Sequence, residues 1–167
     1  MKTWIKILVP VFLALATGQA AAADLKIGVV DTERLLRESA PAVLAEKRLE
    51  KEFAGRNEEI GKLVEQVKGL QAKLDKDGAS LSETARRAKE RELDDLTANL
   101  QRMQREFREN LNMRKNEELI NVLGLANQAI QKIAETGKYD LILQEAVYRN
   151  PKLDITDMVM KYLDTGK

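Results

Sequence analysis

The chain of 167 residues lacks two residue types that carry much enzyme chemistry, since it contains no cysteine and no histidine. Without cysteine there is no disulfide, thiolate metal site or thiol nucleophile, and without histidine there is no histidine-based triad. The nine glycines lack the spacings of the phosphate-binding loops GxxxxGK[ST] and GxGxxG. The sequence therefore predicts a binding protein that is not an enzyme and uses neither a cofactor nor a metal.

Aromatic residues are also scarce, at 4%, whereas charged residues make up 33% of the chain. This mixture is typical of long solvated helices rather than of a compact globule. The 28 basic and 27 acidic residues nearly cancel, so no overall basicity attracts nucleic acid, and so few aromatics offer no platform for stacking bases. We expect an elongated protein that does not bind nucleic acid.

The N-terminus has the pattern of a secretory signal peptide, predicted over residues 1–22. Two lysines precede an uncharged, mostly apolar stretch at 7–16, and three alanines at 20–22 match what signal peptidase recognises. The apolar stretch is shorter than the roughly 20 residues of a transmembrane helix. We expect cleavage before Ala23 or Asp24 and a soluble protein, periplasmic in a bacterium. Its 26 basic and 27 acidic residues would give a net charge of −1.

Short apolar runs near both ends of the mature chain predict strands. The first covers residues 26–30 and is followed by Asp31, which can cap a short helix over 33–38. A second covers 139–143 and a third covers 146–149 across a short turn. A final amphipathic helix is predicted over 154–163. The helix end at 119–134 is apolar around most of its circumference, so we expect it to be buried on several sides.

The middle of the chain predicts two long antiparallel helices. From about Pro41, apolar residues recur at heptad spacing as far as Leu74, and they recur again from Leu93 to Phe107. Between them, Gly78 is placed for a left-handed helix stop, and residues 80–83 fit a capping box. A first helix of about 34 residues makes an arm of roughly 50 Å. We call the heptad positions of the two helices the seam.

Polar residues and glycines interrupt this pattern. The polar breaks in the seam are Arg56, Asn110, Arg114 and Glu117. They either set the register and mark where the arm joins the body, the interpretation we favour, or line a wet cavity. The glycines of the first helix, away from the seam, are Gly55, Gly61 and Gly69. Each costs about 0.8–1 kcal/mol relative to alanine, and they either lie on an exposed face without function or make the arm flexible.

Two further groups of residues are candidates for binding. A body with so few strands has little core, so we expect association of several copies through its apolar strands, at Ile27, Val29, Leu141, Ile142 and Leu143. Residues 66–91 contain seven basic and four acidic residues, a local charge of +3 at the tip of the arm. This tip is either an ordinary solvated turn or a contact for anionic lipid, lipopolysaccharide or acidic protein segments.

Three segments resemble the Skp (OmpH-like) family of periplasmic chaperones. They are Lys26 to Asp31, Phe53-Ala54-Gly55-Arg56 with Glu58-Glu59, and Tyr139 to Leu143 followed by Asp154-Ile155-Thr156. The segments occur in the family's order over the whole mature chain. The resemblance implies a homotrimer that holds unfolded outer-membrane β-barrel proteins without ATP, in a cavity between its arms. It also implies a lipopolysaccharide site near Arg86, Arg87, Lys89 and Arg91.

The fold class that follows is α+β. Strands from both ends of three subunits would build a small β-barrel-like trimerisation body, formed by residues 23–42 and 119–167. Each subunit would add an antiparallel coiled-coil hairpin as an arm over 43–118, with its tip near 77–80. A different class of function stays open, namely a structural coiled-coil spacer or adaptor of the cell envelope. Better-known members of the family are strongly basic, unlike this chain.

Overall fold

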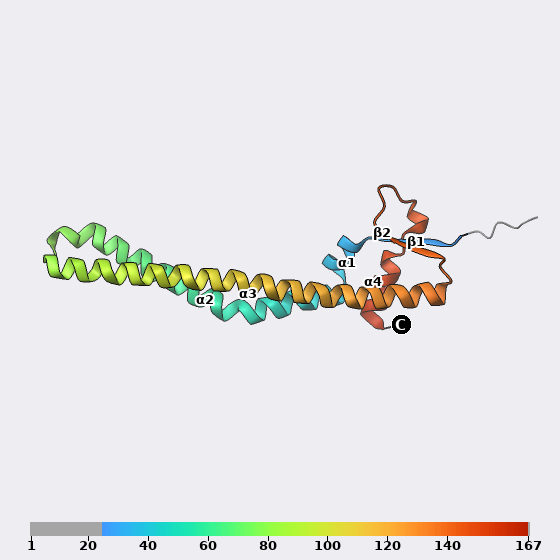
Figure 1. Ribbon diagram of the computed structural model, residues 1–167, viewed down its shortest axis with the longest axis horizontal. Helices are drawn as coiled ribbons and strands as arrows, with labels where there is room; N and C mark the ends of the chain where they lie inside the picture. Colours follow the sequence, from blue (N-terminus) through green and yellow to red (C-terminus); the bar gives the residue numbers. More distant parts are fainter. Residues whose placement is uncertain (1–24, 167) are drawn as a thin grey trace, which may run out of the picture.

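The computed structural model describes residues 25–166, which form a long helical hairpin attached to a small body (Figure 1). The predicted signal peptide lies outside the described residues. The elements in chain order are β1 (Ile27–Val30), α1 (Thr32–Glu38), α2 (Ala40–Asp77), η1 (Gly78–Ser80), α3 (Glu83–Gly137), β2 (Leu141–Gln144), η2 (Pro151–Leu153) and α4 (Thr156–Thr165). Between residues 25 and 166, no helix combines the length and the apolar character needed to cross a bilayer.

The hairpin is formed by α2 and α3, which wind around each other (Figure 1). Pro41 lies in the first turn of α2, where its missing N–H leaves no hydrogen bond unmade. The seam is the contact between the two helices: Phe53, Leu63 and Leu70 are buried there. The rings of Phe53 and Phe107 meet edge to face with centroids 5.5 Å apart. At 1.5 Å per residue, the 55 residues of α3 extend about 80 Å.

The turn at the tip differs in detail from the prediction. Gly78 has right-handed helical dihedrals, so the predicted left-handed stop is wrong, and α2 tightens instead into the 3-10 turn η1. The predicted capping box does not form either. Ser82 is the N-cap of α3 and accepts a hydrogen bond from the Ala85 amide at 3.3 Å, whereas the Ser80 hydroxyl donates to the Asp77 carbonyl. Serine thus caps the helix two residues later than expected.

The sheet of the body has two strands. β1 and β2 pair in parallel, with Ile27 opposite Leu141 and Val30 opposite Gln144, so the whole hairpin lies in the connection between them. The predicted third strand at 146–149 is wrong for this single chain. After β2, Glu145 takes a left-handed backbone with φ of 64°, and the chain leaves the sheet as an irregular loop. Val147 and Tyr148 in that loop are exposed.

The core of the body lies where α3 and α4 meet the sheet and α1. It consists of Val30, Leu35, Ala126, Ala129, Ile133, Ile155 and Val159. Only one side of the 119–134 segment joins this core, because Ile120 on the opposite side is 67% exposed and Leu119 and Leu125 are also exposed. Burial on several sides, expected from composition, is therefore wrong for one isolated chain.

Candidate functional site

The body is held together where its N-terminal strand meets the start of α4. The Ile155 amide donates to the Val29 carbonyl at 3.0 Å, and the Asp31 amide donates to the buried hydroxyl of Thr156 at 2.9 Å. A Cβ on Gly28 would lie 2.8 Å from the Ile155 Cδ1 atom, so a larger residue at this position would force the Ile155 side chain or the strand to shift. Two of the segments that carried the sequence resemblance thus meet in one contact, and their role there is structural.

Arg149 fastens the loop after β2 to the same junction. Its Nη2 atom lies 3.0 Å from Oδ2 of Asp31 and 3.2 Å from Oδ2 of Asp154. Asp31 also caps α1 by accepting a hydrogen bond from the Arg34 amide. That hydrogen bond is the largest cause of the lowered pKa of Asp31, and the hydrogen bond from Arg149 is the next largest. The Nη2 atom thus bridges two carboxylates and fixes the end of the loop that presents Val147 and Tyr148.

A second polar cluster lies where the arm leaves the body. The Glu118 side chain on α3 is only 8% exposed. It accepts a hydrogen bond of 2.6 Å from the Nη2 atom of Arg48 on α2. Arg114, one turn earlier on α3, lies 3.3 Å from Glu118 and reaches across to Glu52 of α2 at 3.1 Å. It also pairs with Glu117. We call Arg48, Glu52, Arg114, Glu117 and Glu118 the arm-base cluster.

The arm-base cluster joins α2 to α3 at a place where the seam has lost its apolar residues. The hydrogen bond from Arg48 is the main reason why the pKa of Glu118 lies below its ordinary value. Arg114 and Glu117 were predicted as polar breaks, and their contacts favour the interpretation that they mark the junction of arm and body. Arg48 and Glu118 were missed, because pairing across a hairpin can be deduced only when its turn is placed to the residue.

The strand residues proposed for self-association differ in their exposure. Val29 is 3% exposed and packs inside its own chain, and Ile27 and Ile142 are half-buried. Leu141 and Leu143 on β2 are 48% and 41% exposed. β2 pairs with β1 along one edge, and within the described residues no other strand lies along its second edge. An open strand edge beside exposed leucines is a surface that proteins normally cover.

The four basic residues of the tip lie in the first turns of α3, and three of them pair with acids of the same helix. Arg86 pairs with Glu90 at 3.6 Å, Lys89 pairs with Glu92 at 3.0 Å, and Arg87 pairs with Glu83. Arg91 forms no ion pair among the described residues, and its Nε atom donates to the Arg87 carbonyl at 3.2 Å. These are exposed, solvated pairs that do not converge on one point.

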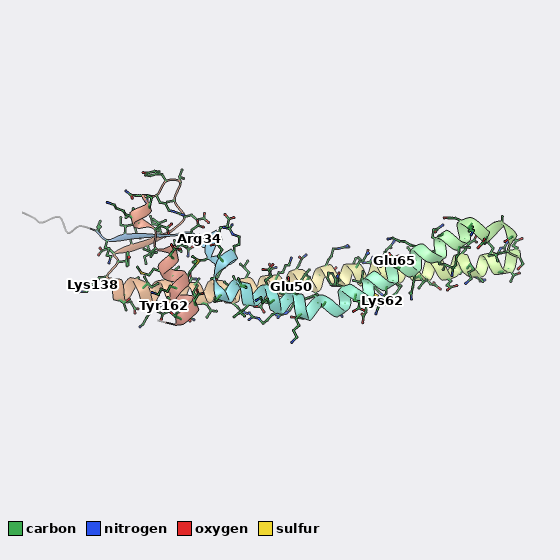
Figure 2. The ribbon with its side chains drawn as sticks, turned by 180° about the vertical axis from the view of Figure 1, so that it is seen from behind. Arg34, Glu50, Lys62, Glu65, Lys138 and Tyr162 are labelled. Atoms are coloured by element: carbon green, nitrogen blue, oxygen red, sulfur yellow. The ribbon has the colours of Figure 1, made fainter. Side chains whose placement is uncertain are left out.

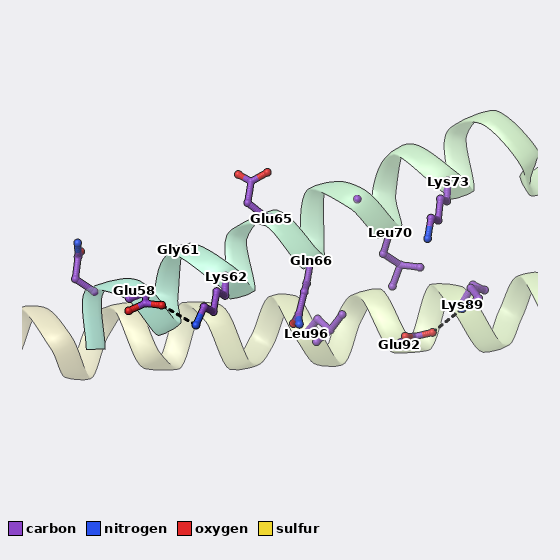
Figure 3. A pocket seen from close by; sticks show the side chains of 12 residues that line it. Glu58, Gly61, Lys62, Glu65, Gln66, Leu70, Lys73, Lys89, Glu92 and Leu96 are labelled. Carbon is purple, nitrogen blue, oxygen red and sulfur yellow. Dashed lines mark hydrogen bonds and ion pairs between the residues drawn. The ribbon is translucent and has the colours of Figure 1, made fainter. Parts of the chain in front are cut away.

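An open groove of about 1230 Å³ lies between α2 and α3 in the outer half of the arm (Figure 3). Its walls carry ion pairs such as Lys62 with Glu58 at 2.7 Å, and Leu70 and Leu96 lie at its floor (Figure 3). Gly61 and Gly69 line it, and a Cβ at either position would meet nothing within 4 Å. Close packing therefore does not require glycine here, and both interpretations of the arm glycines stay open.

Comparison with known proteins identifies the relatives of this arrangement. The sequence profile of the outer membrane protein (OmpH-like) family matches residues 26–163, which include the sheet, both long helices and nearly all of α4. The chain belongs to the Skp (OmpH-like) family. The match includes both the body and the arm, so it covers nearly all of the described fold.

Individual relatives of the family are distant in sequence but similar in length. The chaperone protein Skp of Yersinia enterocolitica is 26% identical over 151 residues, which cover 89% of this chain and 92% of that protein. A Skp-like protein of Pseudomonas aeruginosa is 25% identical, covering 90% and 91%. The crystal structure of an OmpH-like outer membrane chaperone from Caulobacter crescentus superposes with a TM-score of 0.72 at 19% identity, covering 86% of each chain. That structure shares the fold.

Potential metal-ligand side chains do not cluster in the described part of the chain. Between residues 25 and 166, no three aspartate or glutamate side chains come together in a way that could hold a metal ion. Glu50 and Glu65 lie at separate, exposed positions along α2 (Figure 2). Family membership is consistent with a protein that is not an enzyme.

Proposed function

We propose that this protein is a periplasmic chaperone that holds unfolded outer-membrane proteins without ATP and prevents their aggregation. The proposal rests on its membership of a family whose relatives are named chaperone protein Skp. One structural observation supports it most: a helix about 80 Å long carries the arm far beyond the small body. Several such arms side by side could surround an unfolded chain and keep it from meeting another.

The working form in this proposal is a homotrimer joined through the body. Two strands and a few helices bury little apolar surface, and β2 carries an open edge with two exposed leucines. Strands from neighbouring copies would cover that edge and close a barrel-like body. In this arrangement residues 23–42 and 119–167 form the body, and residues 43–118 form the arm.

An aggregation assay tests the holding function directly. A denatured outer-membrane β-barrel protein is diluted into buffer, and its light scattering is followed with and without this protein, in the absence of nucleotide. We expect scattering to be suppressed at a molar ratio near one trimer per client. If this protein forms stable oligomers and leaves scattering unchanged, a structural spacer of the envelope becomes the better explanation.

The proposed location depends on removal of residues 1–22. The small residues at 20–22 directly follow the apolar stretch, so the secreted protein should begin at Ala23 or Asp24. Mass spectrometry of the protein recovered from the periplasm of an expressing bacterium measures this. Recovery there with Met1 retained would contradict cleavage, and recovery only from the cytoplasm would contradict export.

A further inference from the structure

Two apolar hollows run together into one groove on one side of the arm base. Each has a volume of about 480 Å³, and they share Glu46, Leu49 and Lys115. The hollow nearer the body reaches Leu36 of α1 and Val122 of α3, and the other reaches Phe53 and Phe107 of the seam. We call the combined feature the arm-base groove. At Asn57 it adjoins the charged groove of Figure 3, which lies farther out along the arm.

The arm-base groove has the length of a short extended segment. From residue 107 to residue 122, α3 rises about 22 Å at 1.5 Å per residue. An extended chain rises about 3.3 Å per residue, so roughly seven residues would fill this length, with every second side chain facing the floor. A helix of the same length would need about 15 residues folded in advance, which an unfolded client does not supply.

The rim of the groove indicates the charge of its occupant. Glu46 and Glu50 lie one turn apart on α2, and neither forms an ion pair among the described residues. Lys115, on the α3 side, is also without an ion pair there. The α2 rim therefore offers two free carboxylates in line above an apolar floor. An extended segment that alternates apolar and cationic residues would complement both.

We propose that the arm-base groove binds extended client segments in which apolar residues alternate with lysine or arginine. This inference rests on the proposed holding function and gives it a specific contact. The apolar side chains enter the floor around Leu49, and the cationic side chains face Glu46 and Glu50. Leu119, which lines the groove and is 42% exposed, supplies an apolar contact that is accessible before the client arrives.

Fluorescence anisotropy with three labelled eight-residue peptides tests the preference for the segment. The first alternates leucine and lysine, the second contains the same residues in two blocks, and the third alternates leucine and glutamate. The full mature protein is used. The first peptide should bind at least about tenfold more tightly than either of the others. Equal binding of the alternating and block peptides would overturn the proposal.

Matched variants locate the binding. Leu119→Gln removes a groove contact, whereas Ile120→Gln changes the neighbouring exposed residue, which does not line the groove. Glu46→Lys with Glu50→Lys reverses the rim, and Glu59→Lys is the control on an exposed position of α2 outside it. We expect the groove variants to weaken the first peptide about tenfold and the controls to leave it unchanged. Equal effects of Leu119→Gln and Ile120→Gln would refute the assignment.

Two further measurements separate this inference from its alternatives. The mass of each variant by light scattering shows whether a second copy occupies the groove; dissociation caused by Leu119→Gln but not by Ile120→Gln would overturn the client assignment. The aggregation assay of wild type is run in parallel. Suppressed aggregation without peptide binding would leave the proposed function intact and refute the groove. If the wild-type protein fails to suppress aggregation of the client, the proposed function itself is refuted.

Discussion

Two glycines of this chain show how the effect of adding a side chain depends on the surrounding atoms. At Gly28 an added Cβ would come within 2.8 Å of Ile155, whose own side chain is buried in the core. At Gly61 an added Cβ would meet nothing within 4 Å. The same substitution should therefore have opposite signs at the two positions.

Gly28→Ala should lower the free energy of unfolding by about 1–3 kcal/mol, because Ile155 or the strand must move to admit the methyl group. Gly61→Ala should raise it by about 0.8–1 kcal/mol, the helix propensity difference, provided that the arm unfolds with the body. Urea unfolding at one fixed protein concentration measures both. Destabilisation by Gly61→Ala would show that the arm needs its glycine.

The ionised form of Glu118 stabilises the junction of α2 and α3 at the arm base. Its pKa is lowered chiefly by the hydrogen bond from Arg48, so the folded state favours the charged carboxylate. Such a group contributes stability that is present above its unfolded pKa of about 4.5 and is lost as the pH falls toward its lower folded value. The arm base should therefore loosen in acid.

Glu118→Gln should lower the stability at pH 7, since it leaves Arg48 and Arg114 without their shared carboxylate. As the pH falls below about 4.5, the further decrease in stability should be smaller in this variant than in wild type. Thermal unfolding from pH 7 to pH 3 measures both effects. Glu109→Gln changes an exposed residue of α3 that forms no ion pair among the described residues, and it is the matched control. Identical pH profiles for wild type and Glu118→Gln would contradict this role.

At the scale of elements, the hairpin could be predicted because heptad spacing depends on nearby residues of one helix. The seam residues recur every three or four positions, and Phe53 and Phe107 meet as that spacing requires. Pro41 marked the start of α2 for an equally local reason. The exact turn was harder, because Ser80 and Ser82 are both good caps and only packing decides between them.

The absence of the third strand could not be predicted, because strand formation depends on contacts outside the local sequence. Residues 146–149 have strand-like composition, yet a strand forms only where another edge accepts its hydrogen bonds. In the single chain, Glu145 turns away from the sheet and Arg149 is fastened to Asp31 and Asp154 instead. Glu118 was missed for a related reason, since its partner Arg48 is 70 residues away.

The tip of the arm gives a prediction for one element alone. Changing Arg86, Arg87, Lys89 and Arg91 to glutamine turns the local charge of residues 66–91 from +3 to −1. If the tip binds anionic surfaces, sedimentation with anionic vesicles or lipopolysaccharide should fall, and wild-type binding should weaken as salt rises. Three of the four side chains already pair with Glu83, Glu90 and Glu92, so the wild-type effect should be modest.

Client holding by the quadruple variant should persist, because the proposed client contacts lie at the base of the arm and between the arms, and not at the tips. The aggregation assay therefore serves as the control for folding and function. If the variant binds vesicles as strongly as wild type at low salt, the four residues form an ordinary solvated turn and are not a site.

For the whole molecule, the decisive question is whether the body is complete in one chain. A single chain leaves apolar side chains exposed on the body, at Leu141 and Leu143 of β2, Val147 and Tyr148 of the following loop, and Leu125 of α3. A soluble monomer rarely leaves so much apolar surface in contact with water beside an open strand edge. The association through the body proposed above would account for these features together.

Charge on the outer face of β2 separates association from folding. Val29 is unsuitable, because it is buried in its own chain and a charge there would unfold the body. Leu141 and Leu143 are about half exposed in one chain, so Leu141→Lys with Leu143→Lys should leave the fold intact and break the contact between copies. Light scattering should show a trimeric wild type and a monomeric variant, both helical by circular dichroism. Leu81→Lys, on an exposed leucine at the arm tip, should remain trimeric. A folded wild-type monomer at micromolar concentration, or a double variant that stays trimeric, would show that β2 is not the interface.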